Sequence, residues 1–205
     1  MVPIDVYADI WCPFAHVGLR IVRERRWELG RIDVALLIHA WPLELVNGRP
    51  QDAEATAAHI RELRKQISTD LFVAFDPENF PSTTLPALAL AARAYRQSDA
   101  KGEAVSFAVR DALFEEGRDV SDPAVLRDIG ASHLVPAAEE RDRASVLEDW
   151  HQGQLRRVKG SPHFFCGKSE VFCPSLVIGR SGEGHLLIKR NREALDAFLS
   201  GCFGD

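Results

Sequence analysis

The segment DIWCPFAHVG, residues 9–18, decides the fold because it joins a strand-like run to a helix-like pattern through one cysteine. The run IDVYADI, residues 4–10, is short and rich in β-branched residues, which is typical of a strand. Residues 13–29 carry an approximate apolar stripe, with Pro13 in the first turn, where a missing N–H is tolerated. We therefore expect Cys12 at the N-terminus of a helix.

A second strand completes a strand–helix–strand unit. Residues 31–41, RIDVALLIHAW, form a nearly continuous apolar run, which is typical of a buried strand. Gly30 ends the helix before this run. Two strands joined by one helix within roughly forty residues predict parallel pairing through a right-handed crossover.

The middle of the chain, residues 51–159, carries helical patterns and no convincing strand. One helix is well marked, because Asp122 suits the N-cap, Pro123 the first turn and Gly130 the end. The predicted helices span residues 52–67, 83–97, 102–117, 121–130 and 137–158.

Strand patterns return near the C-terminus, where the turn residues SGEG join two short apolar runs. The segment GKSEVFCPSL, residues 167–176, is expected to be a loop that carries Cys173. Residues 191–203 predict a final amphipathic helix with Asn191 as its N-cap. The predicted strands cover residues 161–166, 175–179 and 185–189.

This order of elements predicts an α/β fold that is interrupted by a helical insertion. Residues 1–48 and 150–205 are expected to form one discontinuous domain, and residues 49–149 the inserted helices. A chain of 205 residues is long enough to bury a core without disulfides.

Composition limits the classes of function. The net charge of −5 argues against a nucleic-acid partner, which usually meets a basic excess. No targeting segment and no membrane-spanning apolar run is visible, so we expect a cytoplasmic protein without a membrane partner. Thiols stay reduced in that compartment, and the cysteines are too irregularly spaced for a disulfide framework. They are Cys12, Cys166, Cys173 and Cys202.

The predicted position of Cys12 favours thiol chemistry. A thiol attacks as its thiolate, and a helix N-terminus can lower a cysteine pKa to roughly 3.5–7.5. The backbone N–H groups of Phe14 and Ala15 would stabilise this thiolate. His16, one turn along the helix, would add to the effect if protonated, whereas a packing histidine is the alternative. For Cys12 itself, the alternative is a small buried apolar residue.

The motif DIWCPFAHVG, the long helical insertion and GSPHFF, residues 160–165, together resemble the DsbA-like branch of the thioredoxin superfamily. PSTTLPALALAARAY, residues 81–95, adds to the likeness. The nearest group includes FrnE-like proteins, 2-hydroxychromene-2-carboxylate isomerase and kappa-class glutathione transferases. The resemblance implies a thioredoxin fold with Cys12 as nucleophile and a cis Pro162 facing it. It also implies that the backbone of Ser161 pairs with an extended substrate or a thiol cofactor.

Ala15 departs from the redox members of this branch, which usually carry a second cysteine there. Without it, the chain lacks the thiol that would release a mixed disulfide. This predicts a thiol–disulfide oxidoreductase or isomerase with one active-site thiol, whose mixed disulfide an external thiol such as glutathione resolves. Cys173 is a possible second thiol if its Cα lies within about 7 Å of that of Cys12.

Two other functions stay open at this point. A transferase or isomerase could bind a thiol cofactor and hold its substrate among insertion aromatics, namely Phe72, Phe75, Phe80, Phe107 and Trp150. The second of these functions is a non-catalytic binding module. A buried, inert Cys12 would favour this function. In each case the expected partner is a protein disulfide or a small thiol, with no tightly bound cofactor, and a homodimer is plausible because relatives often pair.

The predicted site therefore has Cys12 and Pro162 as catalytic residues. Residues expected to contact the substrate are Trp11, Pro13, Phe14, Ala15, His16 and Ser161. No metal is predicted, because the spacing of His163, Cys166 and Cys173 lacks the close cysteine pair of structural zinc sites.

Overall fold

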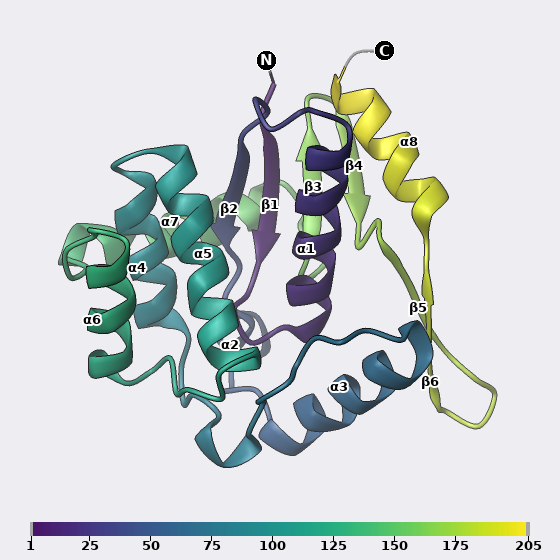
Figure 1. Cartoon of the computed structure of the whole chain (residues 1–205), viewed down its shortest axis with the longest axis horizontal. Coiled ribbons are helices and arrows are strands. Elements are labelled where there is room, and N and C mark those ends of the chain that lie inside the picture. The colour runs from purple at the N-terminus through teal and green to yellow at the C-terminus, as the bar shows by residue number, and fades with distance from the viewer. Residues whose placement is uncertain (1, 204–205) are drawn as a thin grey trace.

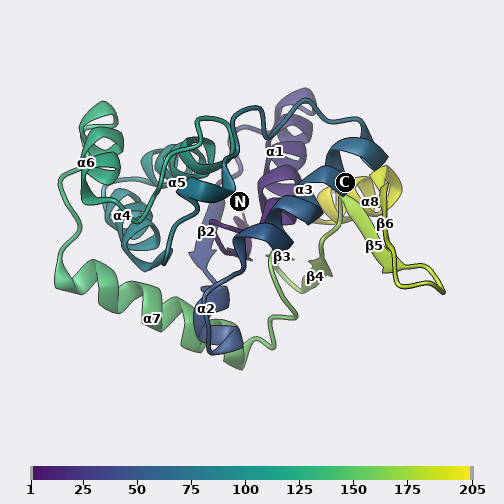
Figure 2. The same cartoon turned by 90° about the horizontal axis from the view of Figure 1, so that it is seen from below.

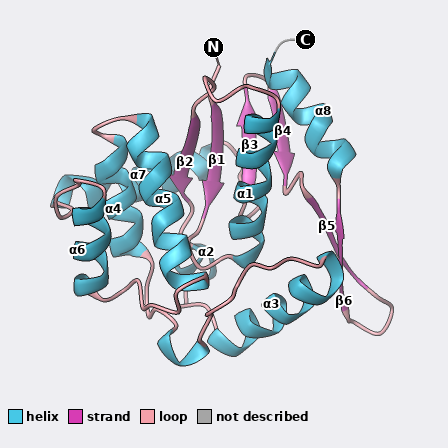
Figure 3. Ribbon diagram, in the orientation of Figure 1, coloured by secondary structure: helices cyan, strands magenta, loops and turns pink. Residues whose placement is uncertain are grey.

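The computed structural model describes residues 2–203, and its centre is a sheet with the strand order β2-β1-β3-β4 (Figures 1 and 3). As predicted, β1 and β2 run parallel, with Ile4 opposite Leu36. β3 is antiparallel to β1, and β4 is antiparallel to β3. The strands are β1 (Ile4–Ala8), β2 (Leu36–Ala40), β3 (His163–Cys166) and β4 (Ser169–Phe172).

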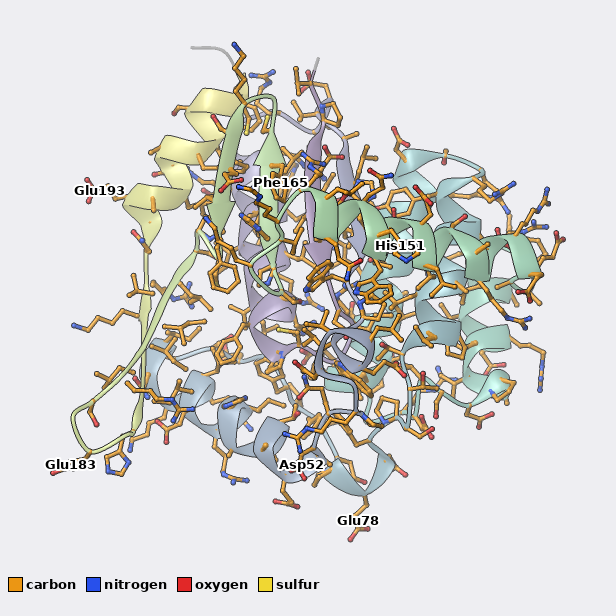
Figure 4. The ribbon with its side chains drawn as sticks, turned by 180° about the vertical axis from the view of Figure 1, so that it is seen from behind. Asp52, Glu78, His151, Phe165, Glu183 and Glu193 are labelled. Atoms are coloured by element: carbon orange, nitrogen blue, oxygen red, sulfur yellow. The ribbon has the colours of Figure 1, made fainter. Side chains whose placement is uncertain are left out.

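The two faces of the sheet bury different side chains because strand residues alternate. Ile4, Val6 and Ala8 pack in one core with residues of α1 (Pro13–Glu28) and α8 (Arg192–Phe203). Tyr7 packs on the opposite face with Trp41 and Phe165, next to α7 (Glu140–Leu155). Figure 4, viewed from behind, shows Phe165 on the same side of the sheet as α7.

The inserted helices stand beside β2 (Figure 1). Their core is continuous with Ile10, Trp11 and Val17, so the sheet region and the insertion share buried side chains. The helices between β2 and α7 are α2 (Leu43–Asn47), α3 (Ala53–Ile67), the 3₁₀ turn η1 (Pro77–Asn79), α4 (Leu85–Tyr95), α5 (Asp99–Phe114) and α6 (Pro123–Ser132).

The free edge of β2 is covered by side chains from the insertion. The Tyr95 hydroxyl donates to the carbonyl of Leu36 and accepts the N–H of Ile38, both at 2.9 Å. Asp149 accepts the N–H of Ala40 at 2.9 Å. These bonds occupy groups that an edge strand otherwise leaves unpaired.

The predicted strands after residue 174 form a separate hairpin, β5 (Leu176–Arg180) and β6 (Leu186–Arg190). Gln66 joins α3 to this hairpin, because its amide donates to the Leu186 carbonyl and accepts the Ile188 N–H, both at 2.8 Å. Seen from below, α3 crosses under the N-terminal end of α1 (Figure 2). We call α3, β5 and β6 the α3–hairpin unit.

Several boundaries differ from the sequence prediction. Residues 169–172 form β4 rather than a loop, because Gly167 adopts a positive φ of 58° in a tight turn that brings them alongside β3. α5 starts earlier, since Ser98 accepts the N–H of Lys101 as its cap. α6 continues past Gly130 to Ser132. Within the described chain, no helix has the length and apolar character needed to span a bilayer.

Candidate active site

Cys12 is the N-cap residue of α1, as the sequence predicts. The backbone N–H groups of Ala15 and Phe14 hydrogen-bond toward its sulfur. On its other side, the Cys12 thiol donates to the carbonyl of Ser161, with Sγ 3.1 Å from the oxygen. The Ser161–Pro162 peptide bond is cis, as the resemblance implies.

The motif holds the proline loop at two further points. The backbone N–H of Asp9 donates to Ser161 Oγ at 2.9 Å. Gly18 allows the loop to approach α1 closely, since a Cβ there would lie 3.3 Å from Pro162 Cγ. The spacing of these residues in the motif therefore fixes Ser161 and Pro162 beside the thiol.

The prediction of a low pKa for Cys12 is wrong. Only 6% of the residue is exposed, and this burial raises its pKa because a thiolate would lose its hydration. The Ser161 side chain and the backbone N–H groups of Ala15 and Phe14 lower the pKa but do not outweigh burial, and the charge of Asp9 raises it further. The resting protein thus holds a neutral thiol.

His16 neither adds charge to the thiol nor faces a substrate, which corrects both predicted roles. Its ring is fully buried between Phe72 and Phe114, and Nε2 lies 2.7 Å from Glu115 Oε1. Burial lowers the pKa of His16 against the opposing effect of Glu115, so the ring is neutral. Glu115 also accepts the N–H groups of Phe72 and Val73, and so anchors the segment after α3.

The other predicted contact residues divide into buried and accessible ones. Trp11 stacks on Phe80 with ring centroids 5.7 Å apart and is only 1% exposed, so it is a core residue rather than part of a groove. Pro13 and Ala15 are likewise buried. Phe14 remains half-buried, with its ring 5.4 Å from that of His59 on α3.

The aromatic residues predicted to wall one pocket lie in three different places. Phe75 packs on Phe80 and Phe114, Phe107 lies in the core between α1 and the sheet, and Trp150 packs on the opposite face. The sequence showed how many aromatic residues the insertion carries, but not which side chains each of them contacts.

Asp9 is a buried residue of the site that the sequence analysis missed. Its carboxylate accepts the Thr84 hydroxyl at 2.8 Å and the N–H of Ile10 at 2.6 Å, and it also accepts the N–H of Leu43. Burial raises the pKa of Asp9 to about 6, although these hydrogen bonds act in the opposite direction. Asp9 therefore ties the end of β1 to the starts of α2 and α4.

Arg110 on α5 was also missed. It is buried and donates to the carbonyls of Ser106 at 2.7 Å and Asp9 at 3.2 Å. Burial lowers its pKa to about 10, and the charge of Asp9 partly offsets this. A charged residue within an apolar run was the available signal, because such a residue is rarely buried without a partner.

Cys173 lies beside the proline loop, directly after β4. Its N–H donates to the Pro162 carbonyl at 3.0 Å. Burial, together with the nearby Cys12 thiol, raises the pKa of Cys173 to about 12. Cys12 and Cys173 are both free thiols here, and a second-thiol role for Cys173 stays a prediction.

No group of three or more possible metal ligands occurs among residues 2–203. Three residues were considered as metal ligands from the sequence. One of them, His163, accepts the N–H of Lys159 at its Nδ1, at 3.2 Å. Cys166 lies at the far end of β3 from Pro162.

The family described as "DSBA-like thioredoxin domain" matches residues 3–179. The chain belongs to this family. The predicted thioredoxin fold with a helical insertion is thereby confirmed, and Cys12 and Pro162 occupy the matched region. No curated protein matches this DSBA-like chain.

Solved structures share the fold of this chain. A probable DsbA oxidoreductase from Streptomyces coelicolor has 17% identity and a TM-score of 0.69, with 100% of this chain and 91% of that chain covered. A 2-hydroxychromene-2-carboxylate isomerase has 14% identity and a TM-score of 0.61, covering 82% and 87%. Cytosolic disulfide reductase DsbM from Pseudomonas aeruginosa has 15% identity and a TM-score of 0.61, covering 97% of both chains, and is also solved with GSH.

Proposed function

We propose that this DSBA-like protein is a thiol–disulfide oxidoreductase that works through a single active-site thiol, Cys12. The observation that carries the proposal is the position of the thiol, between the N–H groups at the start of α1 and the carbonyl of Ser161 before the cis Pro162. Ala15 leaves no thiol at the next turn of the helix.

The reaction begins when Cys12 loses its proton and its hydrogen bond to Ser161. The thiolate attacks one sulfur of a substrate disulfide, the S–S bond breaks, and the departing thiolate takes up a proton. The freed carbonyl of Ser161 pairs with the substrate backbone. A small external thiol, of which glutathione is the proposed example, then attacks the substrate sulfur bound to Cys12 and forms a disulfide with it. Cys12 leaves as a thiolate and takes up a proton.

Access to Cys12 requires a movement, because the thiol is buried at rest. The α3–hairpin unit lies at the N-terminal end of α1, where Phe14 contacts His59. We place the movement in this unit because it adjoins the N-terminal end of α1, where the ring of Phe14 meets that of His59, although Ile60 and Leu63 of α3 also pack into the main core.

The burial of Cys12 favours a second candidate, a non-catalytic binding module on the same fold. A thiol that stays inert in the native protein would serve no exchange reaction. In either case we propose a protein disulfide or a small thiol as partner. The cytoplasmic location and the homodimer stay predictions.

One experiment separates these functions. The reduced protein is incubated with a small-molecule disulfide between pH 6 and pH 10, and each cysteine is mapped by mass spectrometry. A single-thiol enzyme forms a mixed disulfide on Cys12, at a rate that still rises above pH 8 because burial raises the pKa of the thiol. Cys12→Ser abolishes the adduct, and the matched Cys173→Ser variant keeps it.

Two outcomes would overturn the proposal. An internal disulfide between Cys12 and Cys173 would establish a two-thiol mechanism. If Cys12 reacts in the unfolded chain but stays unmodified in the native one, the protein is a binding module.

A further inference from the structure

Cys166 and Cys202 are two thiols that the proposed reaction does not use. Cys166 is the last residue of β3, and Cys202 lies in the last turn of α8. Cys202 packs against the core that contains Cys166, and the two thiols are near enough for Cys166 to affect the ionisation of Cys202. Both are free thiols in this structure.

The backbone, and not only side-chain rotation, brings the two cysteines together. Cys166 pairs with Ser169 across the tight β3–β4 turn. Gly201, next to Cys202, faces the same residue, since a Cβ on Gly201 would lie 3.6 Å from Ser169 Oγ. Figure 1 shows the end of α8 beside this turn, at the opposite end of β3 from Pro162. The pair is therefore separate from the Cys12 site.

We propose that Cys166 and Cys202 are a second redox site, which closes to a disulfide when a small-molecule disulfide reaches the protein. The Cys202 thiolate attacks the oxidant, whose S–S bond breaks, and one thiol leaves with a proton. The Cys166 thiolate then attacks Cys202 Sγ and displaces the second thiol, which also takes a proton. Two protein thiols are oxidised, and one disulfide is reduced to two thiols.

Burial fixes the order of these steps. Cys202 is half-buried, whereas Cys166 is only 4% exposed, so the oxidant meets Cys202 first. Burial and the neighbouring Cys166 raise the pKa of Cys202, which makes the first step slow near neutral pH. The closed disulfide would hold α8 to β3 and stabilise the fold by restricting the unfolded chain.

The test uses the full chain carrying Cys12→Ser and Cys173→Ser, so that this pair is the remaining source of thiols. The native protein is incubated with oxidised glutathione, digested without reduction and analysed by mass spectrometry. We expect a peptide linked through Cys166 and Cys202, a loss of two hydrogens from the intact mass, and no retained glutathione. The melting temperature should rise by about 5 °C or more and return after reduction.

Two further variants in this background sharpen the result. Cys202→Ser should show neither the linked peptide nor the rise in melting temperature. Cys166→Ala should stop at a glutathione adduct on Cys202, because the thiol that displaces glutathione is missing. The inference fails if the parent protein itself stops at that adduct, or if both thiols stay free in the native protein while the unfolded chain is oxidised. Neither failure bears on Cys12, which is absent.

Discussion

The ionisation of Cys12 depends on a competition among its nearest neighbours. Hydrogen bonds at the N-terminus of α1 favour the thiolate, whereas burial and the carboxylate of Asp9 oppose it. Placement at a helix N-terminus is sufficient to activate an exposed cysteine, but here the loss of hydration is the larger effect. A partner that opens the site would therefore change the reactivity of Cys12 directly.

Replacing Asp9 by asparagine should lower the pKa of Cys12. The side chain keeps its size and an oxygen that can accept the Thr84 hydroxyl, but it loses the charge that disfavours the thiolate and the oxygen that accepts the Leu43 N–H. We expect the rate of Cys12 modification to reach its half-maximum at a lower pH than in the wild type. Asp128→Asn, on the exposed surface of α6, is the control. Superimposed pH profiles for Asp9→Asn and the wild type would show that this charge does not act on the thiol.

His39 should make stability depend on pH in the alkaline range. Burial lowers its pKa, but hydrogen bonds and charges from Asp149 and Asp5, at 3.0 and 2.9 Å, outweigh burial and raise it to about 9. The folded pKa exceeds the unfolded value near 6.5, so this stabilisation is complete below pH 6.5 and is lost as pH rises through 9. We expect a loss of up to about 3 kcal/mol, measured by urea unfolding. His39→Gln should remove this loss. If the free energy of unfolding falls equally with rising pH in both proteins, the assignment to His39 is contradicted.

The α3–hairpin unit is the element whose position we connect to the access of substrate. Gln66 links α3 to β6 through both the NH2 group and the oxygen of its amide. Arg190 donates to the Ile67 carbonyl. Phe14 contacts His59 at the α1 end of this unit. Gln66 and Arg190 therefore hold α3 and the hairpin together as one unit, and this unit adjoins the helix end that carries the thiol.

Gln66→Ala should loosen this unit and expose Cys12. Two backbone groups of β6 lose their partner, which should lower the free energy of unfolding by about 1–3 kcal/mol. The rate of mixed-disulfide formation at Cys12 should rise several-fold, as measured with a small disulfide at fixed pH. Gln152→Ala, which removes an exposed amide on α7, serves as the control. A lower melting temperature with an unchanged rate would mean that another element limits access.

At the scale of the whole molecule, the insertion and the sheet are one packed body. Ile10, Trp11 and Val17 of the first βα unit share a core with the helices α4–α6. Asp9 and Arg110 join the same regions by hydrogen bonds. The inserted residues therefore complete the core around the site.

This shared core predicts a single unfolding transition. Tryptophan fluorescence combines the buried Trp11 and Trp41 near the sheet with Trp27 on α1 and Trp150 on α7. It should give the same urea midpoint as helical circular dichroism, which is dominated by the insertion. Chains without residues 49–149 should fail to fold, because they would lose the partners of Trp11 and Asp9. Two separated transitions would show that the predicted insertion is an independent domain.

The sequence by itself was enough for the features that depend on neighbouring residues. The junction at Cys12 and Pro13, the caps at Asp122 and Asn191, and the βα order follow from turn chemistry, capping and periodicity, which act over a few residues. The family motif added Pro162, whose cis bond no local pattern reveals. These features were sufficient for the fold.

Only the tertiary structure decided the state of the site. The neutral thiol of Cys12, the pairing of His16 with Glu115 and the contact of Cys166 with Cys202 all join segments far apart in the sequence. Periodicity shows which side chains are buried but not which ones meet. Loss of hydration and the partners that offset it are set when distant segments pack, and they determine whether a thiol at a helix N-terminus is charged.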